Sequence, residues 1–221
     1  MSTLYHRIAA GSLDRLAALS DGVFAVAITL LVLDIKVPVS EAVHEQRPLW
    51  ETGAVRSEHE LWVALAHLAP RLLPYLMSFV TLGMFWVGQQ TQLNHFARSD
   101  RRLTWIHLAF LSGVTLMPFS TALLAEFITF RLALFVYWLN LLLLGAVLFA
   151  SLRYARRAGL AKPDAEPRAF AAQERRIVTY QALYAASLLL CVVNTYLSIA
   201  MIMLLQLNSA IAPRIWPLNR I

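Results

Sequence analysis

The sequence contains one cysteine, Cys191, and few charged residues, and each shortage excludes a class of protein. A single cysteine cannot form a disulfide framework, a cysteine-rich zinc site or a cysteine-ligated cluster. Charged residues make up 14% of the 221 residues, whereas soluble domains carry about 25%. Hydrophobic residues make up 59%, and the mean hydropathy is +0.60. This excess of apolar surface predicts an integral membrane protein.

The sequence also lacks the short motifs that mark common catalytic and cofactor sites. It has no HExxH, GxSxG or CxxC pattern and no glycine-rich phosphate loop. We therefore expect no enzymatic activity and no resident cofactor or metal. Of the six histidines, only His107 lies well inside an expected span, which argues against paired haem ligands. The TVGYG sequence of carbonyl-lined potassium filters is missing as well.

The apolar runs predict an all-α protein with six transmembrane helices, which form one domain over residues 1–221. A spanning helix needs about 20 mostly apolar residues. Pro118 is expected to kink the third span. The amphipathic segment 61–73 either lies at the membrane interface or extends the second span. The expected spans are 16–37, 74–93, 103–124, 127–152, 177–192 and 195–212.

The last apolar run, 177–212, is too long for one helix and short for two. We place a break at Val193-Asn194-Thr195, because asparagine and threonine favour turns. A single long, tilted helix is the alternative interpretation.

The positive charges support an arrangement with both termini on one side of the membrane. With six spans, fourteen of the nineteen lysines and arginines fall on the side of the termini, and five fall on the other. Cytoplasmic loops carry the excess of such residues, so both termini are predicted to be cytoplasmic. This bias explains the formal net charge of +6 without a nucleic-acid partner.

The first span combines polar residues with a strictly aliphatic stripe. At about 100° per residue, Val26, Leu30 and Leu33 fall within about 60° of one another, and Thr29 lies at the margin. Asp21 lies about 140° from Val26, and we expect it to form a buried polar foot with partners in the bundle. In the plainer interpretation Ser20 or Asp21 caps the start of the helix. The stripe faces either lipid or a shared axis where it lines a pore.

Residues Arg15 to Pro38 read RLAALSDGVFAVAITLLVLDIKVP. This segment resembles the RxxxFSD signature and following helix of the transmembrane protein 175 family, the endolysosomal potassium channels and their prokaryotic relatives. Further resemblances are Ser78-Phe79 with Trp86, Phe110-Leu111, and the run from Met117 to Thr121. The resemblance covers roughly residues 13–124. The phenylalanine of the motif is Leu19 here, and Gln89 and His107 stand where the family usually has histidine and asparagine.

The resemblance implies a homotetramer of six-helix subunits, with the first helices around a central pore. In the family, the aliphatic residues five, nine and twelve positions after the motif aspartate form the constriction. These are Val26, Leu30 and Leu33, the stripe found from the helical angle, and Thr29 matches a threonine implicated in selectivity. The resemblance also implies a polar network that anchors the helix, which here would contain Arg15, Ser20, Asp21, Gln89 and His107.

We therefore expect a potassium-preferring channel in a prokaryotic plasma membrane, gated by a hydrophobic constriction. Its partners would be potassium ions, the lipid bilayer and further copies of the chain. One alternative is a carrier, perhaps proton-coupled, that relays through Asp21, His107 and Glu126. The other is an accessory membrane subunit.

Overall fold

The computed structural model describes residues 13–33, 35, 54–163 and 167–210. These residues form helices, with one isolated bridge between Phe96 and Ala161 and no strand among them. The expected ends of the first span, 36–37, and of the last, 211–212, lie outside the described residues, as do both termini. The helices are α2 (Leu13–Leu33), α3 (Ala54–Ala66), α4 (Ala69–His95), α5 (Arg101–Thr115), α6 (Met117–Glu126), α7 (Arg131–Arg157), α8 (Pro167–Leu189), the 3₁₀ turn η2 (Leu190–Val192) and α9 (Thr195–Ala210).

Four helical segments are long and apolar enough to cross a membrane. They are α2, α4, the pair α5–α6 and α7. The first half of α8 carries Arg168, Glu174, Arg175 and Arg176, which lowers its hydropathy, and α9 has only 16 residues. The described residues thus contain four candidate membrane spans, while α8 is too polar and the apolar α9 too short to be counted among them.

The third span is interrupted near its proline. Helix α5 ends at Thr115, and α6 begins at Met117 with Pro118 in its first turn. Proline has no backbone N–H to donate to the carbonyl four residues earlier, so the helical bonding pattern cannot continue through it. The amide of Leu116 donates to the carbonyl of Gly113 at 3.3 Å, and the chain then resumes as α6.

The chain also turns between η2 and α9, at Val193 and Asn194. The amide groups of both residues donate to the carbonyl of Leu190. The side-chain oxygen of Asn194 accepts a hydrogen bond from the amide of Tyr196 at 2.7 Å, which satisfies a free donor at the start of α9. The two helices are therefore separate elements and not one tilted helix.

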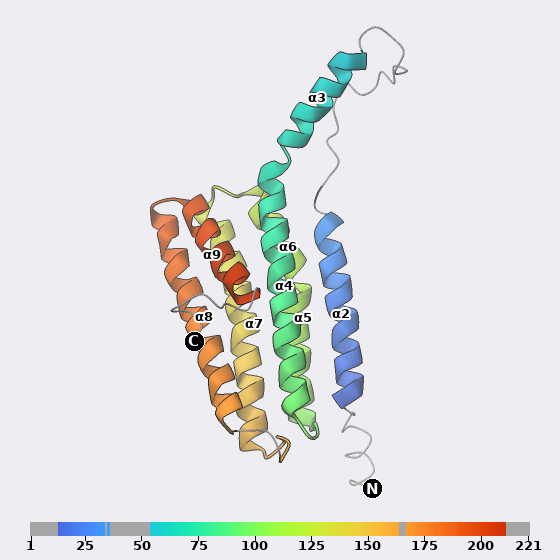
Figure 1. Ribbon diagram of the computed structural model, residues 1–221, viewed down its shortest axis with the longest axis vertical. Helices are drawn as coiled ribbons and strands as arrows, with labels where there is room; N and C mark the ends of the chain where they lie inside the picture. Colours follow the sequence, from blue (N-terminus) through green and yellow to red (C-terminus); the bar gives the residue numbers. More distant parts are fainter. Residues whose placement is uncertain (1–12, 34, 36–53, 164–166, 211–221) are drawn as a thin grey trace.

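The helices form an elongated bundle in which α2 lies at one edge (Figure 1). Helix α2 packs against α4, α5 and α6, while α7 contacts α5, α6 and α8. Helix α9 packs between α4 and α8 and ends part of the way along them (Figure 1). Helix α3 projects from the end of the bundle where α4 begins (Figure 1). Segment 61–73 is thus divided between α3 and α4, with a turn at His67 and Leu68.

A buried polar cluster connects α9 to the centre of the bundle. The side-chain nitrogen of Gln206 donates to the hydroxyl of Thr81 at 2.7 Å, and the Thr81 and Tyr137 hydroxyls lie 3.2 Å apart. Thr121 donates to the Ser78 hydroxyl at 2.6 Å, and that hydroxyl contacts Tyr137 at 3.3 Å. These bonds satisfy polar groups that would otherwise be costly inside an apolar core, and they join α4, α6, α7 and α9.

Gly145 permits the close approach of α7 and α8. A Cβ atom at this position would lie 1.8 Å from Nε2 of Gln181 and 2.6 Å from its Cδ. That amide nitrogen donates to the carbonyl of Leu141 at 3.0 Å. Gly83 on α4 offers a contrast, because its Cβ would meet no atom within 4 Å.

We predict opposite effects for alanine at these two glycines. Gly145→Ala should displace Gln181 and cost about 1 kcal/mol of stability through the lost hydrogen bond. Gly83→Ala should raise stability by roughly 0.5–1 kcal/mol, because alanine is the better helix former. Thermal unfolding of both variants in the same detergent measures the difference. Equal melting temperatures would contradict the close packing at Gly145.

Candidate functional site

Helix α2 has one face buried in the bundle and one face exposed on its outside. Leu16, Ser20, Phe24, Ala27 and Leu31 are buried, and their spacing of three or four residues defines the inner face. The aliphatic stripe lies outside this face: Val26 is 58% exposed, Leu30 is 42% exposed and Leu33 is 69% exposed. The chain therefore presents the stripe either to lipid or to another copy of itself.

Thr29 lies beside the stripe on the exposed side of α2. Its hydroxyl is 2.9 Å from the carbonyl oxygens of both Ala25 and Val26, to which it donates within the helix. The hydrogen is thus held by the backbone, and the hydroxyl oxygen keeps acceptor capacity. Thr29 places a polar oxygen next to an otherwise aliphatic surface.

A chain of buried hydrogen bonds holds the inner face of α2. The Ser20 hydroxyl donates to Oε1 of Gln89 on α4. Nε2 of Gln89 lies 3.2 Å from Nδ1 of His107 on α5, and Nε2 of His107 lies 3.1 Å from the hydroxyl of Ser151 on α7. All four side chains are buried. This chain of hydrogen bonds connects the four helices α2, α4, α5 and α7. It brings together Ser20, Gln89 and His107 of the expected network.

The chemistry of the amide fixes the direction of this chain. Because Oε1 of Gln89 accepts from Ser20, the amide nitrogen faces His107, and an amide nitrogen can only donate. Nδ1 of His107 therefore accepts, and the ring proton resides on Nε2, which donates to Ser151. Every hydrogen bond in the chain points from α2 toward α7.

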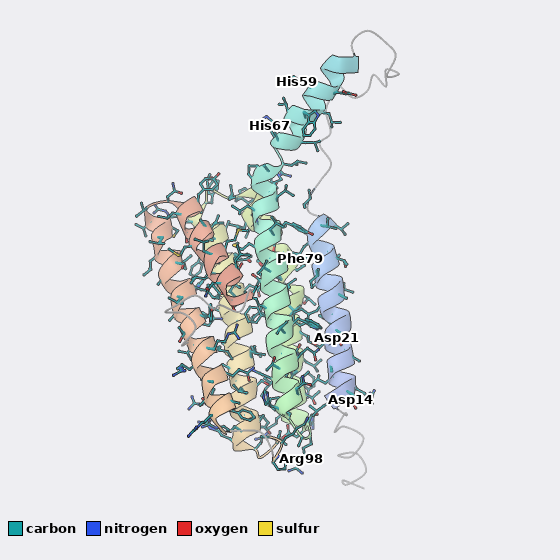
Figure 2. The ribbon with its side chains drawn as sticks, viewed as in Figure 1. Asp14, Asp21, His59, His67, Phe79 and Arg98 are labelled. Carbon is teal, nitrogen blue, oxygen red and sulfur yellow. The ribbon has the colours of Figure 1, made fainter. Side chains whose placement is uncertain are left out.

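Asp21 is held separately, by a second pair of donors on α4. Its Oδ1 accepts from the indole nitrogen of Trp86 and from the amide nitrogen of Gln90, both at 2.7 Å. Both bonds are charge-assisted when the carboxylate is ionised, which makes them stronger than neutral ones. Figure 2 shows Asp21 on α2 beside α4.

The expected burial of Asp21 is wrong, and so is the alternative in which the helix starts at Ser20 or Asp21. Asp21 is not on the buried face, because Ser20 occupies that face and the next residue turns about 100° away from it. Trp86 and Gln90 reach the carboxylate there from α4. Nor do Ser20 and Asp21 cap the helix, since α2 begins at Leu13, about two turns earlier. Arg15 lies in the first turn and is exposed.

Sequence reasoning left three members of these networks unassigned: Trp86, Gln90 and Ser151. Gln89 and Gln90 lie three and four residues after Trp86, so a shared helical face that presents donors could have been recognised from their spacing. Ser151 gave no such signal, because a serine inside an apolar helix usually bonds to its own backbone. Among the described residues no group of histidines, cysteines and carboxylates could hold a metal ion.

The Asp21 bonds should stabilise the attachment of α2. Asp21→Ala removes the acceptor for Trp86 and Gln90 and should lower the unfolding free energy by about 1–3 kcal/mol. Asp21→Asn keeps one acceptor oxygen and should lose less. Asp14→Ala, which removes an exposed carboxylate from the same helix, is the matched control and should change little. Thermal unfolding in detergent ranks the three variants, and an Asp21→Ala variant as stable as the Asp14→Ala control would contradict this account.

The sequence is similar to known channel proteins over its first half. Residues 15–118 match the family described as endosomal/lysosomal potassium channel TMEM175. A potassium channel of Streptomyces collinus is 40% identical over 114 residues, which are 52% of this chain and 48% of that protein. A potassium channel of Chamaesiphon minutus is 42% identical over 115 residues, which are 52% of this chain and 50% of that protein. The matched region spans about half the length of these curated relatives.

Animal relatives and a solved structure extend the comparison. The endosomal/lysosomal proton channel TMEM175 of Homo sapiens is 34% identical over 121 residues, which are 52% of this chain and 22% of the human protein. The crystal structure of a lysosomal potassium-selective channel TMEM175 homolog from Chamaesiphon minutus superposes with a TM-score of 0.74 at 29% identity. The superposition covers 90% of this chain and 96% of the chain in the crystal structure. The fold and the matched sequence agree with the motif in α2: residues 15–118 of this chain match the TMEM175 family, and the fold is that of a TMEM175 homolog.

Proposed function

We propose that this chain is one subunit of a homotetrameric cation channel that prefers potassium, with four α2 helices around a central pore. The proposal depends on one observation: the aliphatic stripe of α2 is exposed while the inner face of the same helix is fixed by buried hydrogen bonds. Bacterial relatives named as potassium channels, and a solved relative named as potassium-selective, support it.

The pore would close by excluding water. Four copies of Val26, Leu30 and Leu33 around one axis would form three stacked aliphatic rings. A narrow hydrophobic ring dewets, and a dewetted segment blocks ions without any physical plug. Opening would require the α2 helices to move apart or tilt. Valine is smaller than leucine, so the ring formed by Val26 would leave the widest opening of the three.

Ion preference would come from dehydration and from Thr29. An aliphatic ring offers no oxygen ligands, so it favours the ion that loses its water shell at lower cost, which for alkali cations is the larger potassium ion. The exposed hydroxyl oxygen of Thr29 would add a weak ligand beside the stripe. No resident cofactor or metal enters this mechanism, and the permeant ion is the only ligand it requires.

The whole chain would act as one channel domain in a prokaryotic plasma membrane, with both termini in the cytoplasm. The charge distribution supports this orientation. The end of the bundle where α2 begins and α7 ends carries Arg153, Arg156 and Arg157, and α5 begins there with Arg101 and Arg102 (Figure 1). Cytoplasmic ends of membrane helices are rich in such residues.

The carrier alternative has less support from the side-chain contacts. It needs Asp21, His107 and Glu126 as proton relay groups, but each is engaged elsewhere. Glu126 forms an exposed ion pair with Arg71 at 2.9 Å. Asp21 accepts from α4, and His107 bonds to Gln89 and Ser151.

Ion flux into liposomes tests the proposed function. Purified protein should conduct potassium faster than sodium, without saturation at high ion concentration, whereas a carrier should saturate. Native mass spectrometry should give four times the 24.8 kDa mass of the chain. Potassium flux no higher than in empty vesicles, over several pH values and membrane potentials, would exclude the channel. A proton flux measured alone, with no potassium flux, would exclude the potassium preference.

Polar substitutions in the stripe should wet the constriction. Val26→Asn and Leu30→Asn should each raise basal potassium flux about tenfold, which corresponds to a barrier lower by about 1.4 kcal/mol. Val32→Asn is the matched control, because Val32 is 49% exposed on the same helix but lies outside the stripe. Liposome flux per reconstituted tetramer is the measurement. Equal flux in all three variants would mean that the stripe faces lipid.

A further inference from the structure

A groove lies between α4 and α8, on the side of the bundle away from α2. Its volume is about 640 Å³. Gly145 and Leu148 of α7 form part of its lining, together with apolar side chains of α4 and α8 such as Val80, Met84 and Ile177. Ser209 and Ala210, the last residues of α9, also border it. The groove exists because α9 is short: it separates α4 and α8 along part of their length and ends at Ala210 (Figure 1).

The groove extends from apolar to charged surroundings. Along α8 it is lined from Ala169 to Tyr184, which is about 22 Å of helix. The part of this stretch that begins at Ala169 belongs to the charged first half of α8. The part that ends at Tyr184 belongs to its apolar second half. Along α4, a clear membrane span, the lining residues run from Phe79 to His95. A site of this length and polarity matches a lipid with its head at one end and an acyl chain along the other.

Arg176 lies at the boundary between the two parts. Its Nη2 donates to the carbonyl and the hydroxyl of Ser209, at 3.3 and 3.0 Å. Its guanidinium carbon lies 5.8 Å from the ring centre of Tyr180, a distance typical of a cation–π contact. These contacts hold the guanidinium in place at the groove.

Arg176 retains donors for an anion. A guanidinium has five N–H groups, and both described bonds start at Nη2, so the three on Nη1 and Nε have no partner among the described residues. The nearest acidic residue in the sequence of α8, Glu174, pairs with Arg156 at 3.3 Å. Within the part of the chain that the structure describes, no carboxylate forms an ion pair with Arg176. Each of these donors can form a charge-assisted hydrogen bond to an oxygen of an anion such as a phosphate.

We infer that this groove binds an anionic phospholipid, with the phosphate on Arg176 and an acyl chain along α4 and α8. The basic end of the bundle favours a lipid of net negative charge over a zwitterionic one, because each arginine near the membrane surface attracts anionic headgroups. This inference goes beyond ion conduction and needs only that the bundle lies in a bilayer.

Lipid binding by the full-length protein tests the site. Native mass spectrometry should show phosphatidylglycerol retained more strongly than phosphatidylcholine when each is titrated onto the delipidated protein. Arg176→Gln should weaken phosphatidylglycerol binding about fivefold, because it removes the charge-assisted hydrogen bond between the guanidinium and the phosphate. Arg175→Gln is the matched control: Arg175 is the adjacent exposed arginine but does not line the groove, so its loss should change binding little.

A second variant tests the apolar part of the groove independently of charge. Gly83 lines the groove, and a Cβ at this position meets no atom within 4 Å, so Gly83→Leu should fill the space without disturbing the fold. It should weaken binding of both phospholipids. Equal retention of the two lipids by the unaltered protein, or equal binding in the Arg176→Gln and Arg175→Gln variants, would overturn the proposal. So would unchanged binding in Gly83→Leu.

Photo-crosslinking identifies the occupant directly. A benzoylphenylalanine introduced at Val80, which lines the groove, should form an adduct with phospholipid in liposomes. An adduct with residues 211–221 of the same chain, or with a second copy, would show that protein fills the groove and would overturn the lipid assignment.

Discussion

The buried hydrogen bond from Ser20 to Gln89 sets the rotation of α2, and the rest of the site depends on that rotation. A polar group left unpaired in an apolar interior is costly, so Ser20 must face Gln89 and the bundle. Because α2 is a regular helix, fixing one residue fixes the direction of all the others. Val26, Leu30 and Leu33 are then all exposed on the outside of the bundle. An apolar surface of this kind needs either lipid or another copy of the chain to cover it.

The parts of the fold that were predictable are those with a strong local signal. Long apolar runs predicted α2, α4 and α7, and asparagine at 194 marked the turn before α9. The aliphatic stripe followed from helical geometry. The same geometry gave the wrong prediction that Asp21 is buried. The angle between Asp21 and Val26 does not determine which side of the helix packs against the bundle. Which residues meet across helices depends on tertiary packing. The spacing of Trp86 and Gln90 indicates a shared face of α4 but not their partner, and Ser151 has no such signal.

The last two helices have a weaker signal for a membrane span, α8 in its hydropathy and α9 in its length. Helix α8 must keep Arg168, Arg175 and Arg176 near the polar surface, and α9 is shorter than a bilayer is thick. Both are held by specific contacts, such as Gln206 on Thr81 and Gln181 over Gly145. The short α9 also leaves the groove between α4 and α8 that a longer helix would have closed.

The one-way order of the Ser20 chain also limits how α2 can move. Turning the helix by one residue would bring Leu19 or Asp21 to the oxygen of Gln89, and neither a leucine nor an ionised aspartate can donate to it. Tilting about Ser20 keeps the bond. Val26 lies about 9 Å along the helix from this pivot and Leu33 about 20 Å. Any tilt therefore displaces Leu33 roughly twice as far as Val26, and in the proposed tetramer the four Leu33 side chains would move apart furthest.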